Sequence, residues 1–303
     1  MNISTSAATP ERVLQRLDWQ VIRRLDGLLQ GNYRSLFYGF GVDFADLREY
    51  QAEDDIRYID WNVTARMQTP YVRQYTEDRE VSAWFLLDMS PSVDFGTVTQ
   101  QGEKRSVLID FATVLARLLT RHGNRVGAMI FGNGLQQTIP ARGGRLQVLR
   151  LINEMLRQPR LSNVPVTDLR MVMRAALNAI KRRSLIFVVS DFISTPGWEA
   201  PLSLLNQRHE VIAIRLYDPA ELELPDVGVM VMEDAETGEQ LYVDTRDKKF
   251  RTSYQSAMLR REEDLKQAFK RTGVDMLSLS TSDDMVKSIV RFAKQREKMR
   301  RLS

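Results

Sequence analysis

The sequence predicts an α/β fold, in which a mostly parallel β-sheet carries helices on both faces. From residue 81 onwards, nearly continuous apolar runs alternate with amphipathic segments, which is the pattern of a parallel sheet covered on two sides. The chain has 303 residues, of which 43% are hydrophobic and 27% are charged. This balance is typical of soluble globular proteins, and the length suggests one large domain or two ordinary ones.

Residues 1–80 are expected to form an N-terminal helix and a small β-rich region. The helix begins with Thr9 as the N-cap and Pro10 in the first helical position, and apolar residues then recur at helical spacing. Further along, aromatic and charged residues alternate, which favours short antiparallel strands and turns, with a half-exposed strand at residues 71–75. We expect Trp61 to lie in the core.

Residues 81–303 are expected to form the main domain, with strands and helices in alternation. Apolar strands are predicted at residues 81–87, 126–131, 185–189, 211–216 and 274–279. Helices are predicted at residues 104–120, 144–156, 168–181, 199–207, 247–271 and 283–301. A β-hairpin of residues 229–233 and 240–243, joined by a glycine-containing turn, is expected within an insertion at about 219–246.

The composition excludes several kinds of site. The chain has no cysteine, which excludes disulfides, cysteine-bound zinc, iron–sulfur clusters and thiol catalysis. Its two histidines, His122 and His209, are too few for a multi-histidine metal cage. No apolar run approaches the ~18 residues needed to span a bilayer, and the N-terminus lacks the features of a signal peptide. We therefore expect a cytoplasmic protein without a transmembrane segment.

The net charge is modest, at +4 from 43 Lys and Arg against 39 Asp and Glu. Much of the excess lies at residues 294–301, which we interpret as a solvated helix end rather than a nucleic-acid-binding surface. Gly39 and Gly41 lack the third glycine and the strand–helix context of a dinucleotide-binding loop. The sequence also has no phosphate-binding Gly-x-x-x-x-Gly-Lys-Ser/Thr loop, so any ATPase partner must be another chain.

Polar residues with oxygen donors lie at or near the ends of the predicted strands. Asp88, Ser90 and Ser92 follow the first apolar strand, Thr167 precedes a predicted helix, and Asp191 follows the strand at residues 185–189. In open α/β sheets, ligands bind beyond the carboxyl ends of the strands, where the strand order reverses. Carboxylate and hydroxyl oxygens suit a hard cation such as Mg²⁺, with Mn²⁺ or Ca²⁺ as alternatives. The sequence therefore predicts that these five residues hold a metal ion.

Simpler interpretations of the same residues stay open. Asp88, Ser90 and Ser92 favour turns in general and can cap a helix without binding a metal. Thr167 is as compatible with an N-cap as with a metal ligand. Asp168 is expected to be a helix-start acid that the helix dipole favours.

The predicted metal ligands resemble the metal-ion-dependent adhesion site (MIDAS) of von Willebrand factor A domains. Asp88, Ser90 and Ser92 match its Asp-x-Ser-x-Ser motif, and Thr167 and Asp191 match its later threonine and aspartate in chain order. The resemblance implies a von Willebrand factor A-like, Rossmann-like fold. It also implies a binding module whose metal accepts an acidic residue from a partner protein.

A second set of motifs runs through most of the chain: Leu47-Arg-Glu-Tyr50, Asp54-Asp-Ile-Arg57, Ile59-Asp-Trp61, Thr64-Ala-Arg66, Arg73-Gln-Tyr75, Arg125-Val-Gly127, Phe131-Gly132, Ser190-Asp-Phe192 and Asp218-Pro219. These motifs resemble the bacterial family called domain of unknown function fifty-eight, over roughly residues 30–281. Glu53 departs from that pattern, because the family usually has glycine before the Asp pair. Members are often encoded beside MoxR-type AAA+ ATPases, so the resemblance implies a metal-dependent adaptor for such an ATPase and a client protein.

Three functions compete on these observations. The leading one is a protein-binding adaptor rather than an enzyme, because the oxygen ligands come without an evident general base or nucleophile. The alternative is a Mg²⁺-dependent phosphohydrolase with Asp88 as nucleophile, Lys181 as phosphate clamp and Asp191 on the metal. Such enzymes usually need a second acid two residues after the first, where this chain has Ser90. The third is a nucleic-acid binder that uses the basic C-terminus, although we expect no nucleic-acid partner.

Overall fold

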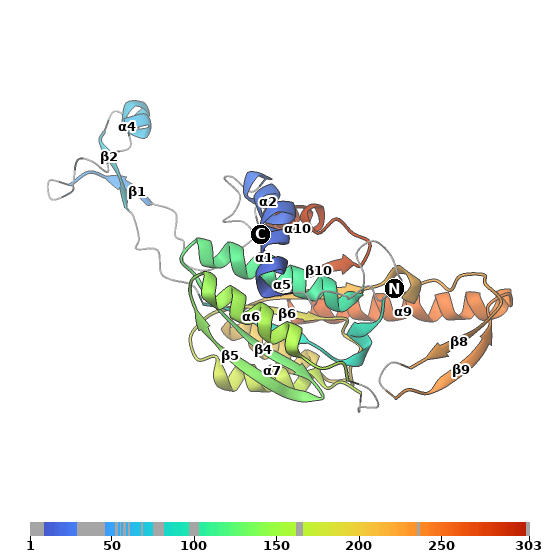
Figure 1. Ribbon diagram of the computed structural model, residues 1–303. Coiled ribbons are helices and arrows are strands. Elements are labelled where there is room, and N and C mark those ends of the chain that lie inside the picture. The colour runs from blue at the N-terminus through green and yellow to red at the C-terminus, as the bar shows by residue number, and fades with distance from the viewer. Residues whose placement is uncertain are drawn as a thin grey trace.

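The computed structural model is built around a six-stranded β-sheet in the strand order β10-β7-β6-β3-β4-β5 (Figure 1). The structure describes residues 9–28, 46–51, 54, 56, 59, 61–67, 69–74, 82–96, 103–161, 166–234 and 237–300. The strands of the sheet are β3 (Ser82–Asp88), β4 (Arg125–Gly132), β5 (Gly134–Arg142), β6 (Leu185–Ser190), β7 (Glu210–Tyr217) and β10 (Asp275–Ser280).

The sheet is mostly parallel, as the sequence predicts, and its strand order is doubly wound. Every neighbouring pair of strands is parallel except β4 and β5, which are antiparallel. Counted along the chain, the six strands lie in the order 3-2-1-4-5-6, and this order reverses between β3 and β6. The carboxyl ends of these two central strands therefore border the crevice in which such folds bind ligands. The predicted α/β fold, a mostly parallel sheet with helices on both faces, is confirmed.

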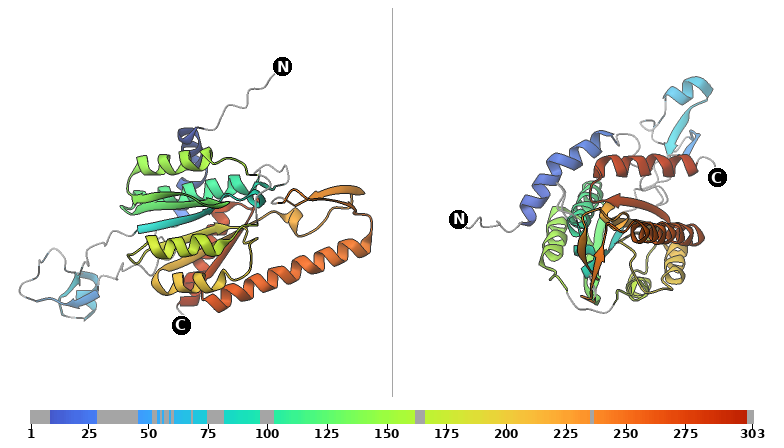
Figure 2. Two further views of the ribbon diagram at one scale, coloured as in Figure 1. Left: turned by 90° about the horizontal axis from the view of Figure 1, so that it is seen from below. Right: turned by 90° about the vertical axis from the view of Figure 1, so that its right-hand side faces the viewer.

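Helices cover both faces of the sheet (Figure 2). Side chains alternate along β3, so Phe85 and Leu87 enter one buried cluster and Leu86 enters the other. The Phe85 and Phe187 rings stack with their centroids 5.1 Å apart. The first cluster includes residues of α1 (Pro10–Leu17), α5 (Lys104–Arg121), α6 (Arg145–Arg157) and α10 (Met285–Arg300). The second includes residues of α7 (Leu169–Ala179), α8 (Glu199–Arg208) and α9 (Lys248–Thr272).

The N-terminal helix begins as predicted and packs on the main sheet's helices. The Thr9 hydroxyl accepts a hydrogen bond from the Arg12 amide at 3.4 Å, and Pro10 is the first helical residue. After α1 the helix continues through a π-helical segment, η1 (Asp18–Ile22), into α2 (Arg23–Leu28). Its buried apolar residues belong to the same cluster as those of α5 and α6. The predicted division at residue 80 stays a prediction.

The small β region contains the predicted short strands and one element that was not predicted. Strand β1 (Asp46–Glu49) pairs with β2 (Tyr71–Gln74) in an antiparallel sheet. Between them lies the helix α4 (Trp61–Met67), where Trp61 is 67% exposed. The prediction of Trp61 as a core residue was therefore wrong. Asp55, Arg57 and residues 29–45 lie outside the described residues.

Strand β5 was not predicted, because little of it is buried. Ile139 is the one fully buried residue of the strand, and Pro140 interrupts its pattern. Pro140 has no amide hydrogen to donate, so proline is tolerated in an edge strand but not in a central one. The antiparallel β5 closes one edge of an otherwise parallel sheet.

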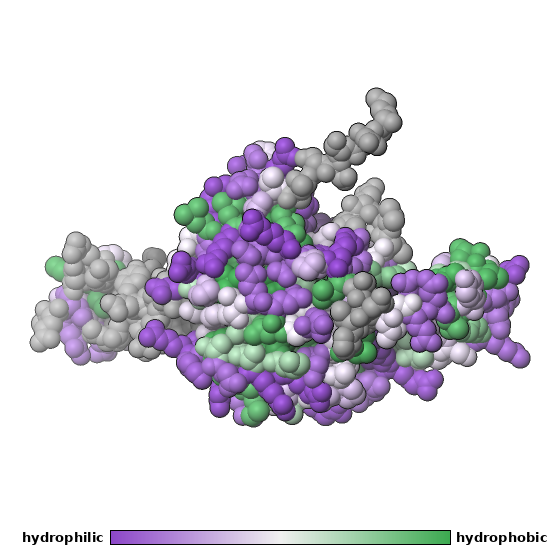
Figure 3. All heavy atoms as spheres, turned by 60° about the horizontal axis from the view of Figure 1, so that its bottom comes forward, coloured by the Kyte–Doolittle hydropathy of each residue, from purple (hydrophilic) through white to green (hydrophobic). Residues whose placement is uncertain are grey.

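The predicted β-hairpin is confirmed, and with α9 it forms a projection that we call the hairpin arm. Strands β8 (Val229–Glu233) and β9 (Gln240–Asp244) pair in antiparallel fashion. The 25 residues of α9 make a helix about 37 Å long, much of which extends beyond the sheet with the hairpin (Figure 1). Figure 3 shows apolar side chains gathered at the hairpin end, where Val229, Leu241 and Tyr242 are 61–73% exposed.

The C-terminal helix α10 differs from its prediction at one basic residue. Residues 294–301 were interpreted as a solvated helix end, but Arg296 is buried and pairs with Glu210 at the start of β7 and Asp275 at the start of β10. Arg296 therefore ties α10 to the sheet. Among the helices of the described chain, none combines the length and the apolar character that a membrane span requires.

Protonation of His209 is expected to destabilise the fold below neutral pH. His209 is 4% exposed at the end of α8, and its ring nitrogens have no hydrogen-bond partner within the described structure. Burial, with the neighbouring charge of Arg208, lowers the pKa of His209 below its usual value of 6.5. The unfolded chain thus takes up the proton at a higher pH than the folded chain, and stability falls as pH drops below about 6.5.

Urea unfolding at pH 7.5 and pH 5.5 measures this effect. His209→Leu is expected to lose less stability than the wild-type protein between the two pH values, since it removes the titrating ring. His122→Gln is the matched control, because it leaves His209 in place and should keep the wild-type difference. Equal differences in all three proteins would contradict the assignment.

Candidate metal centre

Asp88 lies at the carboxyl end of the central strand β3 and is 0% exposed. Its Oδ1 accepts a hydrogen bond from the Ser90 amide at 3.0 Å, and its Oδ2 accepts one from the Ser190 hydroxyl at 2.6 Å. Because Ser190 ends β6, the reversal of strand order brings these two strand ends together. The loop after β3 thus orients one oxygen of Asp88, and the end of the neighbouring strand β6 orients the other.

Ser90 and Ser92 follow Asp88 in a loop that turns at once into a short 3₁₀ helix, η3 (Pro91–Asp94). Pro91 in the first position of η3 suits this turn, since its fixed φ is compatible with a helix start. The two hydroxyls are buried and their oxygens lie 3.1 Å apart. The predicted grouping of the Asp-x-Ser-x-Ser side chains is therefore what the structure shows.

Asp191 lies directly after β6, in a turn held by hydrogen bonds. Its Oδ1 accepts from the Ile193 amide at 3.0 Å, and the Phe192 amide donates to the Ser190 hydroxyl oxygen at 2.9 Å. Phe192 has a φ of 57°, a left-handed conformation that is unusual for a bulky side chain. Its ring packs against Trp198 and Phe269, which stabilises this backbone and so fixes the position of Asp191.

The two carboxylates differ in their protonation. Burial and the nearby negative charge of Asp191 together raise the pKa of Asp88 to about 7, even though hydrogen bonds from Ser190 and Ser90 act to lower it. Burial also acts to raise the pKa of Asp191, but the Lys104 ammonium and hydrogen bonds from Ile193 and Ser92 bring it below its usual range. The centre therefore holds one firmly ionised carboxylate and one that gains from a nearby cation.

Thr167 lies at the same edge of the sheet, on the segment before α7. It is 2% exposed, and its carbonyl accepts from the Thr195 amide of the β6–α8 loop at 3.0 Å, so its segment runs beside the loop of Asp191. Thr167 also lines a cavity of about 160 Å³ with Phe131 at the end of β4 and Met171 of α7. Asp168 caps α7 through the Arg170 amide, which confirms the interpretation of Asp168 as a helix-start acid.

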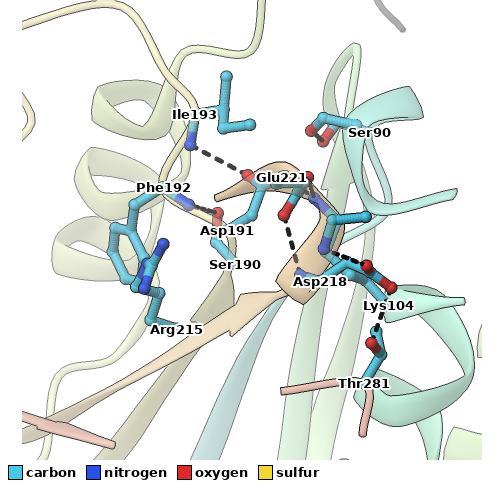
Figure 4. A network of polar contacts seen from close by, with 12 residues as sticks. Ser90, Lys104, Ser190, Asp191, Phe192, Ile193, Arg215, Asp218, Glu221 and Thr281 are labelled. Carbon is cyan, nitrogen blue, oxygen red and sulfur yellow. Dashed lines mark hydrogen bonds and ion pairs between the residues drawn. The ribbon is translucent and has the colours of Figure 1, made fainter. Parts of the chain in front are cut away.

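Lys104 is the residue of this centre that the sequence reasoning missed. It is the first residue of α5 and is 0% exposed, and its ammonium lies 2.8 Å from Asp191 and 2.5 Å from Glu221 (Figure 4). These two carboxylates outweigh the effect of burial, which alone lowers the pKa of Lys104, and raise that pKa above its usual value. The signal in the sequence was a lysine expected at a helix N-terminus, where the helix dipole disfavours a positive charge.

Glu221 belongs to a second layer of polar contacts behind Lys104. It ends the 3₁₀ helix η4 (Pro219–Glu221), where its Oε2 accepts from the Asp218 amide at 2.9 Å. Asp218 is 0% exposed and accepts from the Thr281 hydroxyl at 2.7 Å and from the Ala220 amide at 2.9 Å. Figure 4 shows this network running from the end of β6 to the segment after β10.

The family to which the chain belongs follows from a direct match. The family described as "Protein of unknown function DUF58" matches residues 46–264. The chain belongs to the DUF58 family. The motif-based prediction of this family is thereby confirmed.

Two mycobacterial proteins are similar to this DUF58 protein over nearly its full length. "Uncharacterized protein Mb1516" of Mycobacterium bovis and "Uncharacterized protein Rv1480" of Mycobacterium tuberculosis are each 35% identical to it over 285 residues, which cover 94% of this chain and 89% of theirs. Among solved structures, the conserved hypothetical protein BatB from Bacteroides thetaiotaomicron has a TM-score of 0.45 at 13% identity, over 72% of this chain and 99% of BatB. The SpRpn10 VWA domain has a TM-score of 0.36 at 13% identity, over 70% of this chain and 94% of that domain.

The donor set of the DUF58 protein fits a hard cation in chemistry and in charge. Four of the five predicted ligands, Asp88, Ser90, Ser92 and Asp191, are linked by hydrogen bonds or by charge at two adjacent strand ends. In the part of the chain that the structure describes, no group of three or more His, Cys, Asp or Glu side chains is placed to hold a metal. An ion here depends on hydroxyl oxygens and water as well as on carboxylates, which is usual for Mg²⁺.

Proposed function

We propose that this DUF58 protein is a metal-dependent protein-binding adaptor, whose centre holds Mg²⁺ through Asp88, Ser90, Ser92, Thr167 and Asp191. The observation that carries the proposal is the burial of two carboxylates and two hydroxyls together at the reversal point of a doubly wound sheet. Mn²⁺ and Ca²⁺ use the same oxygen donors and are alternatives to Mg²⁺.

Each residue of the centre has a distinct task in this proposal. Asp191 stays ionised and supplies a permanent negative charge, whereas Asp88 releases its proton when a cation compensates its charge. Ser90 and Ser92 supply neutral oxygens, so the centre carries few negative charges. When bound, the metal would supply a Lewis-acidic position for a carboxylate oxygen of a partner protein. The client we propose therefore presents an acidic residue.

Catalysis is less well supported than binding. In the phosphohydrolase alternative, Lys181 was the phosphate clamp, but Lys181 precedes β6 whereas Asp191 follows it. Lys181 therefore lies at the amino end of β6, at the opposite edge of the sheet from Asp88. Ser90 also occupies the position two residues after Asp88 at which such enzymes usually have a second acid.

Titration with Mg²⁺ tests the metal site. We expect calorimetry and thermal unfolding to show saturable Mg²⁺ binding to the wild-type protein and a loss of at least about tenfold in affinity for Asp88→Ala. Asp168→Asn is the matched control, since Asp168 lies beside Thr167 but pairs with Arg170 outside the donor set. Binding that survives in Asp88→Ala at wild-type affinity would refute the assignment.

We further propose that the partner is a MoxR-type AAA+ ATPase acting on a client in the cytoplasm. A MoxR-type ATPase from the same organism, immobilised in Mg²⁺ and nucleotide, is expected to retain the wild-type protein and to release Asp88→Ala. The variant is a better comparison than chelation, because chelators also strip the ATPase of its nucleotide-bound Mg²⁺. If the ATPase retains both proteins equally, its contact with this protein does not depend on the metal centre.

A further inference from the structure

We propose that Lys104 couples the metal centre to the hairpin arm, because a single buried ammonium is shared between Asp191 of the centre and Glu221 at the base of the arm. The inference rests on the proposed metal binding. It assigns Lys104 and Glu221 as positioning residues that neither the predicted ligand set nor the family motifs include.

The Lys104 ammonium lies within hydrogen-bond distance of both the Asp191 and the Glu221 carboxylate. Its Nζ donates to Asp191 Oδ2 at 2.8 Å and to Glu221 Oε1 at 2.5 Å, and its side chain is 0% exposed. The Asp191 side chain is 2% exposed and that of Glu221 is 24% exposed. The ammonium is therefore enclosed, and the two carboxylates that hold it come from different segments, the turn after β6 and the end of η4 (Figure 4).

A divalent cation at the centre changes this balance. A cation bound by Asp191 lies close to the ammonium on the same carboxylate, and like charges at such separations repel strongly in a buried site. Glu221 is already within hydrogen-bond distance and supplies a second carboxylate for the ammonium. Metal binding is thus expected to shift Lys104 from Asp191 towards Glu221.

Glu221 connects this shift to the hairpin arm. The backbone carbonyl of Glu221 accepts a hydrogen bond from the Tyr254 hydroxyl of α9 at 2.9 Å. The carboxylate of Glu221 accepts from the Asp218 amide at the start of η4, and residues 222–228 lead from η4 to β8, the first strand of the arm. A stronger bond between Lys104 and Glu221 therefore holds the base of the arm more firmly. The metal centre lies at the carboxyl ends of β3 and β6, and the chain leaves the carboxyl end of the parallel strand β7 towards the arm. Both therefore start from the same edge of the sheet, and one partner can contact both.

Two substitutions of opposite effect on the Mg²⁺ affinity test this inference. Lys104→Met removes a positive charge beside Asp191 and is expected to tighten Mg²⁺ binding roughly tenfold. Glu221→Gln removes the negative charge that competes with Asp191 for the ammonium, so that Lys104 stays on Asp191, and is expected to weaken Mg²⁺ binding roughly tenfold. Calorimetric titration of the full-length chain with MgCl₂ measures both. Arg105→Met is the matched control, since buried Arg105 pairs with Asp94 and should leave the affinity unchanged.

Hydrogen exchange supplies a second readout that does not depend on affinity. At saturating Mg²⁺, the amides of residues 220–224, 226 and 227 are expected to become more protected in the wild-type protein and to respond less in Glu221→Gln.

The outcomes separate the two proposals. Wild-type protein that binds no Mg²⁺ overturns the proposed function and this inference with it. Wild-type binding with shifts of the same sign, or below about twofold, in both variants overturns the inference and leaves the metal site standing. If Lys104→Met does not fold, Glu221→Gln decides the question on its own, because its side chain is partly exposed.

Discussion

Asp191→Ala is expected to lower the free energy of unfolding by about 3–5 kcal/mol. The Lys104 ammonium is buried with its Nζ 2.8 Å from Asp191, so removal of the Asp191 carboxylate leaves a buried charge compensated by Glu221 alone. The same change removes one of the two carboxylates proposed to hold Mg²⁺, and Mg²⁺ binding should disappear with it. Urea unfolding and a magnesium titration measure the two effects separately.

Asp168→Ala is the control for this experiment. Asp168 is an aspartate on a neighbouring segment that caps α7 and pairs with Arg170 near the surface. Loss of such a cap costs about 1 kcal/mol, and the Mg²⁺ titration should be unchanged. If Asp191→Ala loses no more stability than this control, Lys104 does not depend on Asp191 and our account of the centre is wrong.

Arg296→Ala is expected to be comparably destabilising, by about 3–5 kcal/mol. The Arg296 guanidinium lies 2.6 Å from Glu210 and 2.6 Å from Asp275, and the Glu210 side chain is only 9% exposed. Without Arg296, Glu210 is left as a buried charge at the start of β7. The change should show in the urea midpoint and leave Mg²⁺ binding of the remaining folded protein intact.

An exposed lysine two residues further along α10 is the matched control for Arg296. Lys298→Ala removes a positive charge from the same basic run, and its effect on stability should stay within about 0.5 kcal/mol. A similar small effect for Arg296→Ala would mean that the pairs at the start of β7 and β10 do not hold α10 in place.

The regular elements of the main domain could be predicted because burial imposes a pattern. Central strands such as β6 are apolar throughout, since helices cover both of their faces. Strand β5 escaped prediction because an edge strand buries little and so carries no such pattern. Trp61 was misplaced for a related reason: size and hydrophobicity favour burial on average, but they do not fix the position of one side chain.

The oxygen donors of the candidate site could be predicted from the sequence, but its buried lysine, Lys104, could not. Asp88, Ser90 and Ser92 stand close together in the sequence, and Asp191 follows an evident strand, so topology alone predicts their convergence. Lys104 is different, because its partners Asp191 and Glu221 lie 87 and 117 residues away. No local pattern records such pairs, and only the positive charge at a helix start hinted at them.

The strand order also bears on how long the centre keeps its geometry. Asp88 and Ser190 sit on the two innermost strands, each with parallel neighbours on both sides. Local opening of a fold begins at its margins, which here are β5 and β10, and seldom reaches the middle before the whole unfolds. The proposed metal ligands on these strands should therefore be preorganised for as long as the domain remains native, so that the proposed partner would meet a rigid site rather than one that forms on binding.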